Sequence, residues 1–184
     1  MIHRLIALLC SASIISAANL ITDNSSFETG RWGYDAVPYA FIRNWPAFVY
    51  PEITGETAAH GKFSLKMANA SGMDSVLLVF PAFSINERTK ITVSFYAKAD
   101  IENTPVSANI ACGWYRKGFI KGFQLSTAWK RYSYEVEVMA DPVKESASAG
   151  NRGVYALYFM LDSVSKPVFS TVWMDAVQVE ANPL

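Results

Sequence analysis

Two short stretches of this chain alternate apolar and polar residues, and they restrict the fold more than any other feature. Residues 92–98 read TVSFYAK, and residues 132–138 read YSYEVEV. Alternation with a period of two places one set of side chains on the buried face of a β-sheet and the other set on an exposed face. No convincing helical periodicity competes with this pattern, so the chain is expected to be all-β.

Further short runs of the same character are separated by glycines and charged residues. Together with the two alternating stretches, they give candidate strands over residues 63–68, 75–83, 90–98, 106–115, 119–125, 130–139, 154–162 and 168–180. Many short strands with short connections favour an antiparallel two-sheet β-sandwich. The segment 30–61 is too aromatic for a flexible linker, and we expect it to pack onto one face or form a wall of a site.

The first 18 residues have the composition of a secretory signal peptide. Arg4 belongs to a short positive head, residues 5–15 are mostly apolar, and Ser-Ala-Ala at 16–18 offers small residues for cleavage. The apolar stretch is too short to span a bilayer. Cys10 raises the alternative of a lipoprotein signal, but no small residue precedes it directly. We expect a signal peptide over 1–18, one domain over 19–184, no membrane span, and a secreted, periplasmic or cell-surface location.

Charge and cysteine content exclude several classes of protein. The chain carries 16 basic and 16 acidic side chains, without the basic face that nucleic-acid binders show, so no nucleic-acid partner is expected. Cys112 is the only cysteine after residue 18, which rules out an internal disulfide in the expected domain. Because it lies in an apolar alternating run, a buried inert thiol is the expected state.

Three segments carry a resemblance to a known fold family. Residues 19–30 read NLITDNSSFETG, residues 123–132 read FQLSTAWKRY, and residues 171–180 read TVWMDAVQVE. In this order they resemble the galactose-binding-like jelly rolls and, within them, the carbohydrate-binding modules of families 4, 9 and 22. The resemblance covers nearly all of the chain after residue 18. It implies a jelly-roll sandwich in which the opening and closing strands lie side by side.

The same resemblance implies a structural calcium site. Glu28 and Asp175 match its carboxylate positions, and main-chain carbonyls near Ser26 and Lys62 would complete it. Ca²⁺ takes six to eight oxygen ligands, so two carboxylates need such help. Independently, two carboxylates on adjacent strands repel each other unless a cation joins them. The alternative is that Glu28 caps backbone amides and Asp175 bonds a neighbouring hydroxyl.

Carbohydrate sites need flat aromatic faces together with amides, carboxylates or arginines for the sugar hydroxyls. Two groups of residues and one amide offer this chemistry: Trp114, Tyr115 and Arg116 at a strand end, Tyr34, Arg43 and Trp45 in the early aromatic segment, and Gln124 on a neighbouring strand. Other aromatic residues are expected to fill the core, namely Trp129, Phe95, Tyr134 and Trp173. Trp173 is assigned there because it shares strand parity with Asp175, Val177 and Val179.

Residue types argue against catalysis. His60 is the only histidine after residue 18, no Gly-x-Ser-x-Gly signature is present, and a zinc site of the usual His and Cys type is nearly excluded. Glycosidase chemistry needs only two carboxyl groups. Glu135 and Glu137 share one face of a strand, but a solvated outer face is the expected place for them.

The sequence therefore predicts a secreted, non-catalytic carbohydrate-binding module with a structural calcium. It would recognise a plant- or microbial-type polysaccharide or oligosaccharide by aromatic stacking, and a separate glycan-degrading enzyme is a further candidate partner. The first alternative is a structural or protein-interaction jelly roll that does not bind sugar. The second is a small glycoside-active enzyme.

Overall fold

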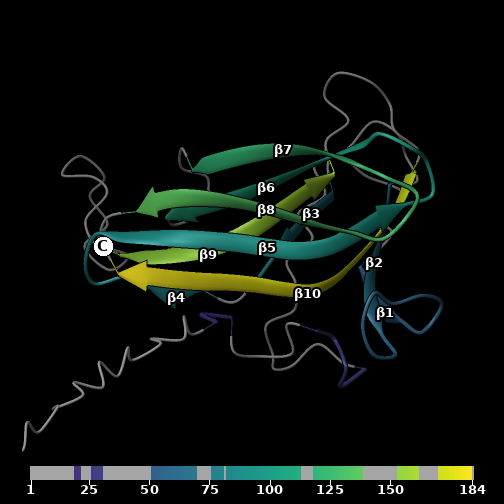
Figure 1. The fold of residues 1–184 in the computed structure, drawn as a ribbon, viewed down its shortest axis with the longest axis horizontal. Helices are drawn as coiled ribbons and strands as arrows, with labels where there is room; N and C mark the ends of the chain where they lie inside the picture. The colour runs from purple at the N-terminus through teal and green to yellow at the C-terminus, as the bar shows by residue number, and fades with distance from the viewer. Residues whose placement is uncertain are drawn as a thin grey trace, which may run out of the picture.

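The computed structural model describes residues 19–21, 26–30, 51–69, 76–80, 82–112, 118–138, 153–161 and 170–183. These residues form ten β-strands in two antiparallel sheets that pack face to face (Figure 1). The expectation of an all-β, two-sheet sandwich is confirmed. Within the described ranges, no helix is long and apolar enough to cross a membrane.

The first sheet has the strand order β1-β2-β10-β5-β8. Its strands are β1 (Glu52–Thr54), β2 (Ser64–Asn69), β10 (Ser170–Pro183), β5 (Thr89–Ala99) and β8 (Lys130–Val138). Asn19 forms an isolated antiparallel bridge with Glu180 of β10, and the Leu20 amide donates to the Val179 carbonyl at 2.6 Å. The opening residues of the described fold therefore lie beside its closing strand, as the resemblance implies.

The second sheet has the order β3-β9-β6-β7, and β4 pairs with β9 outside this path. Its strands are β3 (Val76–Val79), β9 (Val154–Leu161), β6 (Thr104–Cys112), β7 (Phe119–Leu125) and β4 (Phe83–Ser84). The sequence predicts one strand over 75–83, but the structure has two short ones. The sequence has a proline at position 81, a residue type that cannot donate to a sheet ladder.

The core lies between the sheets and follows the alternation of the sequence. Ile91, Val93, Phe95 and Ala97 of β5 are fully buried. The Phe95 ring stacks on Tyr132 of its own sheet, and it meets Phe123 and Phe159 of the other sheet edge-on, with centroids 5.3 and 4.7 Å away. Phe95 and the partly buried Tyr134 thus pack in the core as predicted.

A β-bulge in β10 overturns the prediction for Trp173. The pairing with β5 shifts between Asp175 and Gln178, and Ala176 has a positive φ of 45°. The extra residue turns the strand, so Met174 before the bulge and Val177 after it both enter the core. Trp173 lies on the outer face, and it does not share the orientation of Val177.

Candidate functional site

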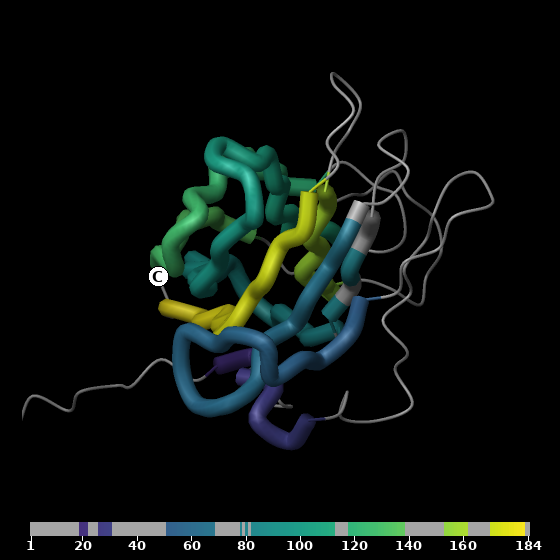
Figure 2. Tube along the Cα trace, turned by 90° about the vertical axis from the view of Figure 1, so that its right-hand side faces the viewer, coloured from purple at the N-terminus to yellow at the C-terminus, as the bar shows by residue number. Residues whose placement is uncertain are grey.

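A turn near the N-terminus directs Glu28 toward the β1–β2 loop (residues 55–63). Phe27 is fully buried against Phe80 and has a φ of 61°, while the Gly30 amide donates to the Phe27 carbonyl at 2.9 Å. The buried ring fixes the turn, and Glu28 accepts the Lys62 amide at 2.9 and 3.2 Å. Figure 2 shows the purple N-terminal segments next to this blue loop.

Gly61 allows the Glu28 carboxylate to approach the loop so closely. A Cβ at this position would lie 2.3 Å from the Glu28 carboxyl carbon, and the residue has a φ of +66°. Both the space and the backbone conformation therefore require glycine.

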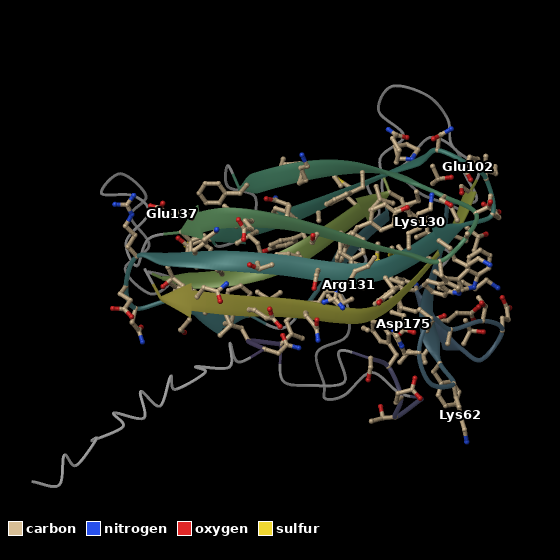
Figure 3. All side chains as sticks on the ribbon, in the orientation of Figure 1. Lys62, Glu102, Lys130, Arg131, Glu137 and Asp175 are labelled. Carbon is tan, nitrogen blue, oxygen red and sulfur yellow. The ribbon has the colours of Figure 1, made fainter. Side chains whose placement is uncertain are left out.

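Asp175 holds the same loop from the opposite side. Its side chain is fully buried, and Oδ2 accepts the amides of Ala59 at 2.9 Å and His60 at 2.8 Å. Oδ1 accepts the Ala176 amide in the bulge at 2.6 Å. Burial raises the pKa of Asp175, the nearby Glu28 charge adds to this, and the three amides oppose it. In Figure 3, Asp175 lies near Lys62 at one end of the sandwich.

The structure thus brings Glu28 and Asp175 to one short loop, where their oxygens accept backbone N–H groups. This matches the capping alternative for Glu28, whereas the partners of Asp175 within the described ranges are backbone amides and not a hydroxyl. The Lys62 backbone amide donates to the Glu28 carboxylate, and Ser26 lies partly buried in the turn. The described residues contain no group of three or more His, Cys, Asp or Glu side chains suited to a metal. Calcium binding stays a prediction.

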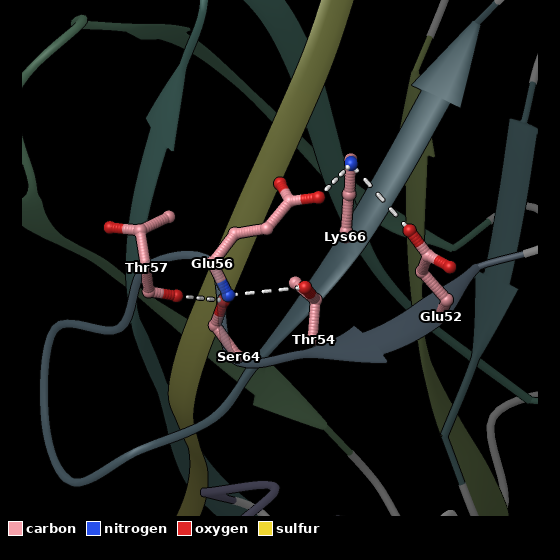
Figure 4. A network of polar contacts seen from close by, with 6 residues as sticks. All are labelled: Glu52, Thr54, Glu56, Thr57, Ser64 and Lys66. Carbon is pink, nitrogen blue, oxygen red and sulfur yellow. Dashed lines mark hydrogen bonds and ion pairs between the residues drawn. The ribbon is translucent and has the colours of Figure 1, made fainter.

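Other side chains fasten the β1–β2 loop to the first sheet. The Lys66 ammonium lies 2.7 Å from Glu56 and 3.6 Å from Glu52 (Figure 4), and this contact lowers the pKa of the exposed Glu56. The Trp129 indole donates to the Thr57 hydroxyl at 3.1 Å. Trp129 is only partly buried and lies outside the core cluster, so its predicted core position is wrong.

On the outer face of the first sheet, cations cover the aromatic rings. The Lys98 and Lys66 ammonium groups lie 5.2 and 5.9 Å from the centre of the Trp173 ring. The Arg131 guanidinium lies 5.5 Å from the Tyr96 ring and donates to Gln178 at 2.6 Å. Because its own cations occupy these rings, this face offers a sugar less stacking surface than the presence of Trp and Tyr suggests.

The outer face of the second sheet combines amide, aromatic and apolar groups in register. Asn109 of β6 pairs with Ile120 of β7 on one side and with Tyr158 of β9 on the other. The Asn109 amide oxygen is buried and has no hydrogen-bond partner among the described residues. Gln124 is exposed on the same face of β7, where it pairs with Pro105. Donors and acceptors for sugar hydroxyls therefore lie beside a tyrosine ring.

Of the sugar-binding residues predicted from the sequence, only Gln124 lies within the described residues. The other six lie outside them: Trp114, Tyr115, Arg116, Tyr34, Arg43 and Trp45. The sequence reasoning missed Asn109 and Tyr158. The alternation of residues 106–110 (VSANI) contained the signal for Asn109, because it places Val106 and Ile110 inward and Asn109 outward.

The carboxylates considered for glycosidase chemistry are solvated. Glu135 and Glu137 are exposed, and they pair with Lys90 at 2.6 Å and with Arg88. Each takes part in an ion pair on the outer face of the first sheet, as expected for a solvated strand face.

Comparisons with known proteins place the fold. Neither a protein-family model nor a curated protein sequence matches the chain. Among solved structures, a family 61 carbohydrate-binding module in complex with β-1,4-galactotriose is similar, with a TM-score of 0.59 and 10% identity. The similarity covers 90% of this chain and 100% of that module.

Two further structures extend the comparison. The xylan-binding CBM22-1 domain of Xyn10C from Paenibacillus barcinonensis has a TM-score of 0.52 at 14% identity, covering 90% of this chain and 95% of that one. A family 11 module from Clostridium thermocellum, in complex with a β-1,3-1,4-mixed-linked tetrasaccharide, has a TM-score of 0.52 at 12% identity, covering 81% and 91%. The chain thus shares the two-sheet β-sandwich fold of these modules.

Proposed function

We propose that this protein is a non-catalytic carbohydrate-binding module that holds a glycan on the outer face of its second sheet. The observation that carries the proposal is the row formed by Ile120, Asn109 and Tyr158 across three strands, with Gln124 exposed on the same face. The Asn109 amide oxygen lacks a partner among the described residues but lies buried against Gly118, so the exposed Gln124 amide is the group that a sugar hydroxyl reaches directly. The similar modules with bound oligosaccharides support this reading.

Affinity electrophoresis on xylan, β-glucan, galactan, mannan and pectin tests the proposal. Wild-type protein is expected to be retarded by at least one polymer. Gln124→Ala should weaken that binding about fivefold, the effect of one lost hydrogen bond. The sequence-predicted platforms give two stronger variants, Trp114→Ala and Trp45→Ala, and the variant of the residue that stacks on sugar should lose about tenfold.

Glu137→Gln is the matched control for these variants, because it alters an exposed side chain on the first sheet. It should migrate like wild type in every gel. Absence of retardation on all five polymers would contradict the proposal. It would favour the protein-interaction alternative, which the exposed Phe119 and Ile120 side chains support.

The proposed function includes a structural Ca²⁺ between Glu28 and Asp175. The fit rests on two carboxylates at one loop whose charges already act on each other. Each carboxylate oxygen has more than one acceptor site, so it can receive an amide and still face a cation. Carbonyls near Ser26 and Lys62 would supply further oxygens. The ion would tie the first described segment to the last strand, without a catalytic part.

Calcium is therefore expected to raise the melting temperature in a saturable way. At one hundred times the dissociation constant, the gain is about 2.7 kcal/mol, which corresponds to several degrees for a domain of this size. Calorimetry with calcium, magnesium or chelator measures it. Glu28→Gln should abolish the calcium response, while Glu102→Gln should keep it. Glu102 is a fair control because it also accepts a backbone amide, from Thr127 at 2.8 Å. An unchanged melting temperature in calcium would show that the amides alone satisfy both carboxylates.

A further inference from the structure

The side of the sandwich carries a groove that shares only Ile120 with the row of residues behind the proposed function. Strand β7 is the edge of the second sheet and β8 is the edge of the first. A groove of about 440 Å³ lies between them, lined by Phe119, Ile120, Lys121, Ser133, Tyr134, Glu135 and Val136. Gln124, Asn109 and Tyr158 do not line it.

The apolar part of the groove is unusually accessible. Phe119 is 45% exposed and Ile120 is 61% exposed, and they follow each other in sequence on an edge strand. Val136 forms the floor from the opposite strand and is nearly buried. A half-exposed phenylalanine ring beside aliphatic side chains offers a surface to the C–H face of a sugar ring.

Tyr134 supplies an unsatisfied polar group in the same groove. Its hydroxyl oxygen is buried and has no hydrogen-bond partner among the described residues. Burial raises the pKa of Tyr134 above its ordinary value, so the phenol keeps its proton and can donate. Buried hydroxyls are nearly always paired, so this unpaired phenol behind the groove lining is a donor that a ligand reaches when the ring turns outward.

The rim completes the polar set. Ser133 and Lys121 are exposed, and the Lys121 ammonium has no carboxylate partner within the described part of the chain. Glu135 is exposed too, but it is engaged by Lys90. Two aromatic rings, two hydroxyls and an ammonium group thus surround a small apolar floor.

We propose that this groove is a second saccharide-binding site, which meets the outer face of the second sheet at Ile120 and otherwise uses different residues. The inference rests on the proposed function and extends it to a new surface. Each wall is three or four residues long, 119–121 and 133–136, which corresponds to about 10–13 Å of strand. That length suits a short saccharide, whereas an ordinary added peptide strand of about 5–6 residues needs about 17–20 Å.

Methyl-labelled NMR separates the two sites in one titration. Val136 reports on the groove, and Met160, on the outer face of β9, reports on the second sheet. Ile120 borders both sites, so its signal alone does not distinguish them. The probes are the methyl β-glycosides of galactose, xylose and glucose, β-1,4-galactotriose, and the β-1,3-1,4-mixed-linked tetrasaccharide. At least one of these five is expected to shift the Ile120 and Val136 signals in a saturable manner.

Two variants decide whether the groove residues bind the saccharide. Phe119→Ala should reduce groove affinity at least tenfold. Tyr134→Phe should reduce it about fivefold while leaving the melting temperature unchanged or higher, because the variant removes an unpaired buried hydroxyl. A merely structural tyrosine would not give these opposite effects. Gln124→Ala should leave the groove titration unchanged.

The outcomes distinguish the two proposals. Shifts at Met160, with or without a shift at Ile120 but with none at Val136, would overturn the groove site and leave the proposed function standing. No shift at Val136 with any of the five probes would also overturn the groove site, and the polymer gels test the proposed function separately. Concentration-dependent dimerisation that Phe119→Ala abolishes, without a saccharide shift, would assign the groove to protein contact instead and so overturn the proposal.

Discussion

Replacing Phe95 with alanine is expected to lower the free energy of unfolding by about 3–5 kcal/mol, the usual cost of emptying a buried aromatic site. Phe95 is fully buried, and its ring contacts Tyr132 in the first sheet and Phe123 and Phe159 in the second. The cavity would therefore open between the two sheets, where the strands on both sides restrict collapse. Urea denaturation followed by circular dichroism measures the change.

Phe119→Ala is the control, because it makes the same chemical change at a ring that is 45% exposed. It should cost less than about 1 kcal/mol, in line with the small apolar area it removes from contact. Equal losses of unfolding free energy for Phe95→Ala and Phe119→Ala would show that the packing of Phe95 between the sheets adds no stability.

Replacing Asp175 with alanine is expected to lower the free energy of unfolding by about 3 kcal/mol. The amides of Ala59, His60 and Ala176 would lose their acceptor, and an unsatisfied buried donor costs about 1–3 kcal/mol. Chemical denaturation in chelator isolates this effect from any metal. Glu102→Ala removes a fully solvated amide acceptor and should cost far less. Equal losses of stability in Asp175→Ala and Glu102→Ala would mean that the burial of Asp175 does not increase the cost of removing an amide acceptor.

The same carboxyl predicts a pH dependence. Since the pKa of Asp175 is raised in the folded protein above its ordinary value of 3.8, the folded state binds more protons in that range. Its contribution to stability is therefore greatest below the unfolded pKa, and it is lost as pH rises through the folded pKa. Asp175→Asn should remove this slope from a pH series of denaturation midpoints measured in chelator.

The sequence alternation predicted the strands well because one face of each is buried. Residues 90–98 and 130–139 correspond closely to β5 and β8, whose inward side chains form the core. Strand β1 was missed because three residues are too few to show a period. Residues 75–83 were predicted as one strand because they are mostly apolar, but the structure divides them into β3 and β4. Hydrophobicity does not report whether the backbone can continue a sheet ladder.

The position of Trp173 could not be predicted, because parity along a strand holds only while the strand is regular. One extra residue at the bulge reverses the facing of every position beyond it. The sequence of residues 174–178, MDAVQ, does not indicate a bulge. The residue with positive φ there is Ala176, and alanine is uncommon in that conformation.

For the candidate sites, Glu28 and Asp175 both contact the β1–β2 loop, while their role as calcium ligands stays a prediction. The resemblance could not show that the β1–β2 loop turns its amides toward both carboxylates, because that depends on the close approach at Gly61. The groove between β7 and β8 was also beyond sequence reasoning. Its walls come from the edges of two different sheets, and no single periodic pattern contains both.

The central place of β10 has a consequence for the order in which the chain can fold. This strand lies between β2 and β5, although it comes last along the described chain. Until it has left the ribosome, the first sheet exists only as two separate pieces, β1 with β2 and β5 with β8, each with an open edge. Native pairing across so long a stretch of sequence is slow, and such edges invite association. A nascent chain of this protein is thus vulnerable to aggregation until residues 170–183 are made, and a chain shortened before residue 170 would remain so.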